Sequence, residues 1–340
     1  MKIVVTIQHP AHVHFFKNAV RQLSEHHQVT VFVREKDVAT ELLEGYGIPY
    51  ETLAGPTNSF LELAYTQLIY ESRLLRRARE IEPDVMAAIA EPGVAHVATV
   101  VGSTGLIFTD TEHATLQNKL AFPFCDAVYT PTCYRNEIGE KQIRYSGYHE
   151  LAYLHPDRFE PNPDVLADID AREDESLVVM RLVSWDAAHD VGNSGFDRTQ
   201  EVVSRLERTG ARVLLTSESP LPNSLEQHRI DISPCQIHDL MYYSELFVGE
   251  SPTMATESAV LGTPAIYASS IELGYVTELS EQYGLIFEYN GADRQSKSIE
   301  KALEILRNTS AQTWERKRER LLSEKVDTTE YMIQEITKHE

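Results

Sequence analysis

Residues 248–264, VGESPTMATESAVLGTP, place two hydroxyl groups at the start of a predicted helix and a carboxylate one turn further in. Ser251 is a favoured N-cap residue, and the first-turn N–H groups of a helix attract anions because they have no partner within the helix. Thr253 and Glu257 are four residues apart and therefore share one helix face. The stretch predicts either a site for an anionic ligand with hydroxyl groups or an ordinary capped helix with a solvated glutamate.

A second candidate follows the first apolar run of the chain. The stretch IQHPAHVHFF, residues 7–16, contains His9, His12 and His14. An imidazole with a pKa near about 6.5 can take a proton from a hydroxyl at neutral pH, so His12 is a candidate base. The alternative is a set of polar residues that cap a helix. We expect no metal site, because residues two apart on a helix point to opposite faces and no acidic ligand pair accompanies them.

The loop at 180–196, MRLVSWDAAHDVGNSGF, follows a predicted strand and is rich in polar residues. Arg181 offers a forked cation for phosphate, and Ser184 offers a hydroxyl. His189 and Asp190 could polarise a leaving group or hold the loop in place. Pairing of Arg181 with a nearby acid is the alternative.

Two acids also come directly after predicted strands. Glu91 lies in AEPG, and Glu112 lies in TDTEHA beside His113. Ligands of open α/β sheets bind outside the carboxyl ends of the strands, so both acids are candidates for proton transfer.

The elements that position these residues alternate along the chain. The first half has β-rich apolar runs at 2–7, 29–33, 84–90, 105–110 and 126–130, with helical periodicity at 12–26, 38–47 and 60–81. The second half has such runs at 177–182, 211–217, 245–249, 264–269 and 285–289. This alternation predicts an α/β protein with two Rossmann-like, doubly wound parallel-sheet domains facing across a cleft.

The predicted domains follow a change in composition. The proline-rich, acidic stretch around 161–175 is predicted as a linker. It separates an N-terminal domain, 1–160, from a C-terminal domain, 176–312. A charged final helix within 313–340 is expected to pack back toward the N-terminal domain.

Charge and composition exclude a nucleic-acid-binding protein and indicate a salt-rich environment. The net charge of -21 opposes binding to nucleic acid, which needs a basic face. The 31 basic residues comprise 10 Lys and 21 Arg, and lysine poverty with acidic excess indicates a halophilic cytoplasm, where molar salt screens charge beyond about 3 Å. An acidic mesophilic protein is the alternative.

The remaining features also favour a cytoplasmic protein. Three widely spaced cysteines, Cys125, Cys133 and Cys235, suggest reduced thiols, and the apolar runs are too short for a transmembrane segment. The chain starts directly on a predicted strand, so we expect no signal peptide.

The whole chain resembles the archaeal and bacterial family called domain of unknown function 354. The resemblance is carried by HPAHVHFFK at 9–17, TDTEHA at 109–114, NKLAFPFCDAVYTP at 118–131, YSGYHELAYLHP at 145–156, RLVSWDAAHD at 181–190 and TMATESAVLGTPAI at 253–266.

Residues 249–266 also resemble the donor-binding segment of GT-B-fold enzymes, especially the non-hydrolysing UDP-N-acetylglucosamine 2-epimerases. This resemblance implies that Ser251 and Thr253 contact phosphate and that Glu257 contacts ribose. Where those enzymes have a glycine after the serine, this chain has Pro252, which removes a backbone donor. Phosphate contact then rests on the N–H groups of Thr253 and Met254 and on the two hydroxyls.

The N-terminal motifs resemble two kinds of GT-B enzyme. PAHVHF is similar to the GGHVFP motif of the N-acetylglucosaminyl transferase of peptidoglycan synthesis, which places His12 on its histidine and Ala11 on a glycine. Glu91 and Glu112 fall near acid and base positions of the 2-epimerases. The third acid of those enzymes is missing near 114–119, and their His-Arg-Arg-Glu motif is absent from 181–190.

The resemblance implies a metal-independent glycosyltransferase that moves a sugar from a nucleotide-sugar donor to a hydroxyl acceptor in glycan or surface polysaccharide synthesis. The acceptor is a small molecule, a lipid-linked compound or a glycan, and His9, His14 and His113 belong to its side of the site. No cofactor beyond the nucleotide sugar is expected. The alternatives are a nucleotide-sugar 2-epimerase and a non-catalytic nucleotide-sugar-binding protein.

Overall fold

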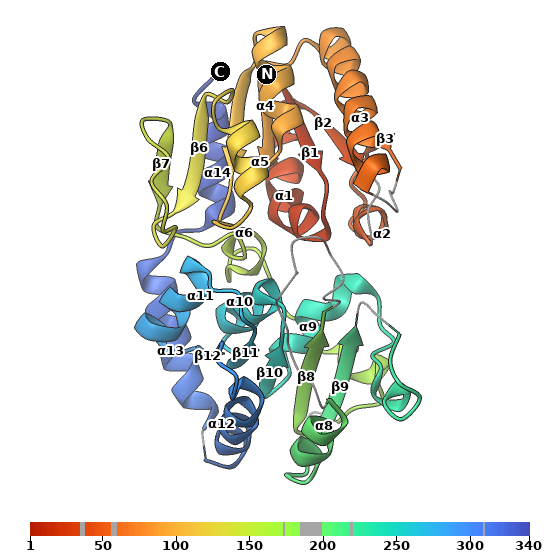
Figure 1. Ribbon diagram of the computed structural model, residues 1–340, viewed down its shortest axis with the longest axis vertical. Coiled ribbons are helices and arrows are strands. Elements are labelled where there is room, and N and C mark those ends of the chain that lie inside the picture. Colours follow the sequence, from red (N-terminus) through yellow and green to blue (C-terminus); the bar gives the residue numbers. More distant parts are fainter. Residues whose placement is uncertain (35–37, 56–59, 173, 184–198, 218–219, 309) are drawn as a thin grey trace. The chain divides into compact units, whose positions relative to one another are not determined.

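The computed structural model describes residues 1–34, 38–55, 60–172, 174–183, 199–217, 220–308 and 310–340, with the backbone alone for residues 60–64. The chain forms two compact units (Figure 1). Unit 1 comprises Met1–Arg158 and Lys325–Glu340, and unit 2 comprises Phe159–Glu324. The last segment of the chain therefore belongs to the first unit.

Unit 1 contains a sheet of seven parallel strands in the order β3-β2-β1-β4-β5-β6-β7. The strands are β1 (Lys2–Ile7), β2 (Gln28–Arg34), β3 (Glu51–Ala54), β4 (Val85–Ile89), β5 (Thr104–Phe108), β6 (Ala127–Pro131) and β7 (Gln142–Tyr145). The inner strands are buried along nearly their whole length, as expected where helices cover both faces of a parallel sheet.

Two layers of helices cover this sheet. The helices of unit 1 are α1 (Pro10–Leu23), α2 (Ala39–Gly45), α3 (Phe60–Ile81), α4 (Pro92–Val101), α5 (Thr115–Ala121), α6 (Leu151–Leu154) and α14 (Thr328–Thr337). Ile107 of β5 joins the core beneath α3 and α4. The next residue, Phe108, faces the other side and packs on Phe15 of α1, with ring centroids 5.4 Å apart. Helix α1 in turn packs against α6 and α14.

Unit 2 contains five parallel strands in the order β12-β11-β10-β8-β9. They are β8 (Leu177–Leu182), β9 (Arg212–Ser217), β10 (Leu246–Gly249), β11 (Ala265–Ala268) and β12 (Ile286–Tyr289). The helices are α7 (Asp164–Asp168), α8 (Thr199–Glu207), α9 (Ile237–Tyr242), α10 (Pro252–Leu261), α11 (Gly274–Glu278), α12 (Arg294–Asn308) and α13 (Ala311–Glu324), with single helical turns η1 (Glu226–His228), η2 (Pro234–Gln236) and η3 (Leu279–Tyr283).

The predicted class, α/β with two parallel sheets, is confirmed, and the sequence-based description differs from the structure in three places. Strands β3 and β7 were not predicted, because each is only four residues long and partly exposed at a sheet edge. The expected linker at 161–175 contains α7, which packs on α9 within unit 2. The prediction of a single final helix is wrong. Two helices form, because the helical run breaks before Asp327 and the carboxylate of Asp327 caps α14, so α13 lies in unit 2 and α14 in unit 1.

None of the described helices is long and apolar enough to cross a membrane.

Candidate functional site

In each unit the strand order reverses at one place, and ligands of open α/β sheets bind there, outside the carboxyl ends of the strands. The reversal lies between β1 and β4 in unit 1 and between β8 and β10 in unit 2. All strands of a unit are parallel, so their carboxyl ends share one edge. We call these edges the carboxyl edge of unit 1 and the carboxyl edge of unit 2.

Helix α10 begins at the carboxyl edge of unit 2. Ser251 is its N-cap, with an extended backbone at φ -88° and ψ 116°, and its hydroxyl accepts a hydrogen bond from Met254 N at 3.3 Å. The N–H of Met254 is thus already used, whereas the sequence analysis assigned it to a ligand. Thr253 lies half-buried in the first turn, where N–H groups have no partner within the helix. The helix start retains its anion-binding geometry with one donor fewer than expected.

One turn into α10, Glu257 is only 4% exposed, so the solvated-glutamate interpretation is wrong. Its Oε1 lies 2.9 Å from Nε2 of His238, which comes from α9 and is 1% exposed. His238 was not among the predicted site residues. The signal was present in QIHDLMY, where a histidine occupies a position on the buried face of a helix. The ribose role of Glu257 remains a prediction.

The ends of β8 and β10 are tied together by Glu250. Its N–H donates to Arg181 O at 3.2 Å, and its carboxylate accepts a hydrogen bond from Val183 N at 2.9 Å. Nη1 of Arg181 donates to Thr216 Oγ1 at 2.8 Å, so the guanidinium lies toward β9. The glycine before Glu250 is required, because a Cβ at Gly249 would lie 3.0 Å from Arg181 O and closer still to a phenylalanine ring. Glu250, the first residue after β10, was not among the predicted site residues.

Three predicted donor-binding residues, Ser184, His189 and Asp190, lie outside the residues that the structure describes. Their roles stay predictions.

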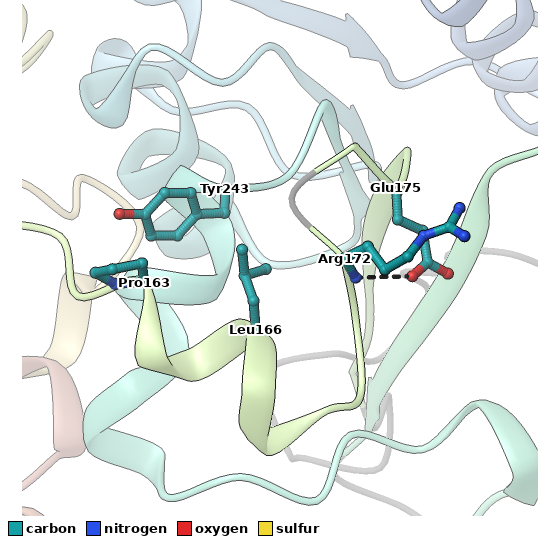
Figure 2. Close-up of a pocket in the computed structure, with 5 residues that line it drawn as sticks. All are labelled: Pro163, Leu166, Arg172, Glu175 and Tyr243. Atoms are coloured by element: carbon teal, nitrogen blue, oxygen red, sulfur yellow. Dashed lines mark hydrogen bonds between the residues drawn. The ribbon is translucent and has the colours of Figure 1, made fainter.

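Unit 2 also has a pocket of about 380 Å³, and Figure 2 shows the side chains that line it: Pro163, Leu166, Arg172, Glu175 and Tyr243. Within it, Arg172 N donates to Glu175 Oε2 at 3.3 Å. Glu175 precedes β8, so the pocket lies toward the amino end of that strand. No predicted site residue lines it.

At the carboxyl edge of unit 1, Glu91 is 3% exposed and accepts a short hydrogen bond from the hydroxyl of Thr6 in β1. Burial raises the pKa of Glu91 to about 7, an effect that the Thr6 hydroxyl partly offsets. Its other oxygen, Oε1, is buried near Tyr70 OH and Gln8 Nε2. None of these three atoms completes a hydrogen bond of good geometry with the described residues, but Tyr70 and Gln8 are close enough to lower the pKa of Glu91, as Thr6 does. A carboxyl group that titrates near neutral pH can exchange a proton with a substrate.

The backbone around Glu91 is arranged for a close approach. Ala90 has a φ of 43°, which is strained for a residue with a side chain, and Pro92 opens α4. A Cβ at Gly93 would lie 3.2 Å from Glu91 Oε1 and 3.5 Å from Cε1 of Tyr70. Tyr70 itself has its pKa raised, by burial and then by the charge of Glu91. Glu91 and Tyr70 therefore share one buried environment.

The histidines after β1 differ in placement. His9 is the N-cap of α1, and its Nδ1 accepts a hydrogen bond from Ala11 N at 3.2 Å, as the capping interpretation predicts. His12 lies in the first turn of α1, with Nδ1 3.4 Å from Gln8 N. His14 lies within α1, as the helical periodicity at 12–26 predicts; it is 6% exposed and stacks on Tyr153 with ring centroids 5.2 Å apart. Its place on the acceptor side stays a prediction.

The loop after β5 holds the other predicted acid. Glu112 is half-buried, and its Oε1 accepts a hydrogen bond from Arg135 N at 3.1 Å. His113 is exposed in the adjacent turn. The role of each in proton transfer or acceptor binding stays a prediction.

A second buried acid–histidine pair, in unit 1, was not predicted from the sequence. Thr109 and then Asp110 follow the end of β5, and His149 lies in the segment after β7. Oδ2 of Asp110 lies 3.2 Å from Nδ1 of His149. The two side chains are 14% and 9% exposed. Both residues stand in motifs of the sequence, TDTEHA and YSGYHELAYLHP, but their separation along the chain hid the pairing.

Within the described ranges, no group of three or more His, Cys, Asp or Glu side chains is placed to hold a metal ion.

Two α/β units, each with a parallel β-sheet and polar residues at its carboxyl edge, define a GT-B-like fold. The chain belongs to the family described as "Protein of unknown function (DUF354)", whose model matches residues 1–338. An uncharacterized protein of Methanocaldococcus jannaschii is 21% identical over 289 residues, which cover 80% of this chain and 83% of that protein.

Solved structures with this fold include enzymes of two kinds. The UDP-GlcNAc 2-epimerase of Neisseria meningitidis bound to UDP-GlcNAc has a TM-score of 0.71 at 12% identity, covering 99% of this chain and 100% of that one. MnaA of S. aureus, in a co-structure with UDP, has a TM-score of 0.69 at 12% identity, with coverage of 98% and 95%. The spinosyn rhamnosyltransferase SpnG has a TM-score of 0.65 at 12% identity, with coverage of 98% and 100%. At these identities the similarity shows the fold alone.

Proposed function

We propose that the chain is a glycosyltransferase that moves a sugar from a nucleotide-sugar donor to a hydroxyl acceptor without a catalytic metal. The observation that carries the proposal is Glu91: a buried carboxyl group with a pKa of about 7 at the carboxyl edge of unit 1. Transfer to a hydroxyl needs one group that accepts its proton at neutral pH, and catalysis is most efficient when the pKa of that group is close to the working pH.

In the proposed step the acceptor hydroxyl gives its proton to the Glu91 carboxylate. The acceptor oxygen forms a bond to the anomeric carbon of the sugar, and the bond from that carbon to the β-phosphate oxygen breaks. The nucleoside diphosphate leaves with the bonding electron pair, and Glu91 ends the step protonated. Glu91 is thus favoured over His12 and Glu112 as the base, because its pKa and its second oxygen suit the role.

Unit 2 is the proposed donor side. The start of α10 at Ser251 and Thr253 would stabilise the charge that builds on the leaving diphosphate, with Arg181 as a second source of positive charge. Glu257 would accept hydrogen bonds from the ribose hydroxyls, and His238 fixes the orientation of its carboxylate. The fold supports this assignment, since the solved structures with it include complexes with UDP and with UDP-GlcNAc. We place the reaction in the cytoplasm of a halophilic archaeon, on the acidic, lysine-poor composition.

The direct test is isothermal titration of the full chain with a panel of UDP, GDP and TDP sugars, in molar KCl and at low salt. We expect binding of at least one donor and release of its nucleoside diphosphate when a mixture of hydroxyl acceptors is added. No binding to any donor defeats the proposal. Binding without nucleotide release under any acceptor points instead to a non-catalytic nucleotide-sugar-binding protein.

A nucleotide-sugar 2-epimerase is the second candidate. The observation in its favour is that unit 1 carries two separate proton-accepting groups, Glu91 and the Asp110–His149 pair. Elimination and re-addition of the nucleotide requires a proton to leave and return at the second carbon of the sugar. Solvent deuterium at that carbon, with no acceptor present, would identify the epimerase. Its absence during nucleotide release supports transfer.

A further inference from the structure

The segment after β7 carries His149 into the carboxyl edge of unit 1. Nδ1 of His149 is 3.2 Å from Oδ2 of Asp110, and the other oxygen of Asp110 accepts a hydrogen bond from the Thr111 hydroxyl at 2.8 Å. Both carboxylate oxygens of Asp110 are therefore engaged. A carboxylate held in this way fixes the orientation of the imidazole that it contacts.

The backbone on both sides of His149 is fixed by α14. The hydroxyl of Thr328 donates to Tyr148 O at 2.7 Å, and the hydroxyl of Thr329 donates to Ala152 O at 2.7 Å. Both threonines are fully buried. The segment is thus held at its start and at its end by a helix that lies far away along the chain.

Packing fixes the ring itself. The imidazole of His149 lies against the ring of Phe15 in α1, with centroids 4.3 Å apart. A Cβ at Gly147 would come 2.8 Å from the Thr328 hydroxyl, so this close approach requires glycine. The ring therefore packs on α1, and the glycine lets the segment lie close to α14.

One atom in this rigid arrangement stays without a bond. Nε2 of His149 is buried and has no hydrogen-bond partner among the residues that the structure describes. The carboxylate at Nδ1 places the ring proton there and leaves a lone pair on Nε2. Burial lowers the pKa of His149 and so favours the neutral ring, although the charge of Asp110 opposes the effect. A buried polar atom without a partner is unfavourable, and its retention here indicates a use.

We infer that His149 is a substrate-binding residue of unit 1, whose Nε2 accepts a hydrogen bond from a hydroxyl group of a neutral sugar or polyol, and that Asp110 is its positioning residue. A lone pair in a buried site binds O–H donors and repels carboxylates and phosphates. Asp110 follows β5, the neighbour of β4, so the pair belongs to the same edge as Glu91. The inference rests on the proposed function in one respect: if the chain is a glycosyltransferase, this hydroxyl compound is the acceptor of the sugar.

The test is nitrogen-detected NMR of the full chain labelled with 15N-histidine, titrated with methyl β-D-glucopyranoside as the hydroxyl probe. We expect the free protein to show His149 with Nδ1 protonated and Nε2 unprotonated. The probe should shift the Nε2 resonance. A protonated Nε2 in the free protein, or an Nε2 resonance that the probe leaves unmoved, overturns the inference.

Two variants separate binding from packing. His149→Phe keeps a ring against Phe15 and removes the acceptor, so the dissociation constant of the probe should rise about tenfold, the worth of one hydrogen bond. Asp110→Asn keeps the shape and should mix the two tautomers of His149 and weaken the probe response. The matched control is His228→Phe, which removes a histidine whose Nε2 lies 2.9 Å from Glu207 in unit 2. Probe affinity that His149→Phe leaves at the value of this control contradicts the inference.

The inference and the proposed function fail in different ways. Donor titration in the same samples reports on unit 2. A His149 that responds to the probe, in a protein that binds no nucleotide sugar, supports the inference and defeats the proposed function. Donor binding and turnover with a silent His149 do the reverse.

Discussion

The carboxyl edges of the two units hold the same kinds of side chain in different bonding states. In unit 1, Glu91 and His149 are buried with one polar atom each that completes no hydrogen bond of good geometry in the described part of the chain, and burial shifts the pKa of both. In unit 2, the hydroxyl of Ser251 and the carboxylate of Glu257 are engaged by Met254 and His238. Groups held by neighbouring side chains keep a fixed geometry that suits binding, whereas buried groups with spare bonding capacity and shifted pKa values suit proton transfer.

The two histidine–acid pairs differ in which ring nitrogen contacts the acid. His149 meets its acid through Nδ1, which leaves the distal nitrogen, Nε2, pointing away from the acid. His238 meets Glu257 through Nε2, so its distal nitrogen is the one that is bonded. The first arrangement presents a nitrogen to a ligand, and the second clamps a carboxylate. Variants of these residues and the pH dependence of stability test this contrast.

The largest expected effect is on turnover. Glu91→Gln keeps the size and the bond to Thr6 but cannot accept a proton, so we expect turnover to fall about 10²- to 10⁴-fold with donor affinity unchanged. Steady-state kinetics and titration of the donor measure the two quantities. The matched control is Glu335→Gln, another buried carboxyl group of unit 1, which accepts a hydrogen bond from Tyr129 OH at 3.1 Å. Equal turnover in Glu91→Gln and Glu335→Gln would show that Glu91 is not the catalytic base.

The second effect is the pH dependence of stability. The pKa of Glu91 is about 7 in the folded chain, against 4.5 for an ordinary glutamate. Between these values the unfolded chain loses its proton first, so stability falls as the pH rises through this window, by about 3 kcal/mol in all. The free energy of unfolding, measured by denaturant between pH 4 and pH 8, should lack this component in Glu91→Gln. If the free energy of unfolding depends on pH in the same way in the wild type and in Glu91→Gln, the pKa of Glu91 in the folded chain is that of an ordinary glutamate.

The third effect lies in unit 2. Glu257→Ala should weaken donor binding by about 1.5 to 3 kcal/mol, because a charge-assisted contact to the ribose is lost. Titration calorimetry measures it, with Glu281→Ala, an exposed acid of the same unit, as the control. Donor affinity equal to that of the control would leave Glu257 as a structural partner of His238.

The smallest effect concerns the clamp. His238→Phe keeps a ring but leaves the buried Glu257 carboxylate without this hydrogen bond, so the free energy of unfolding should fall by about 1 to 3 kcal/mol. His228→Phe should cost less, because its partner Glu207 is 43% exposed and water can solvate it. Denaturant unfolding compares the two. A larger loss in His228→Phe would contradict the assignment of the clamp.

Local patterns were enough to predict the class of fold. Runs such as 177–182 and 245–249 alternate with helical periodicity, and alternation of this kind requires parallel strands. Strand β7 escaped prediction because four residues at an edge carry little hydrophobic signal. The final helix was drawn as one because no proline or glycine marks the break before Asp327, which depends on capping and on packing in unit 1.

The candidate site was predictable where one residue and its neighbours decide the outcome. Ser251 followed by Pro252 identified the start of α10 from sequence. The burial of Glu257 could not be foreseen, because its partner His238 comes from another helix. The pair Asp110 and His149 was hidden for the same reason, since only the sheet brings the ends of β5 and β7 to one edge. The pKa of Glu91 depends on burial, which no local pattern reports.

The two threonines of α14 that hold Tyr148 and Ala152 have a consequence for the order of assembly. Domains generally fold as they emerge from the ribosome, and all of unit 2 is synthesised between the segment that carries His149 and the helix that fixes it. The first unit to be translated is therefore the last to acquire its finished form. A stalled or shortened nascent chain would contain a complete second sheet and a first sheet whose histidine segment lacks its anchor.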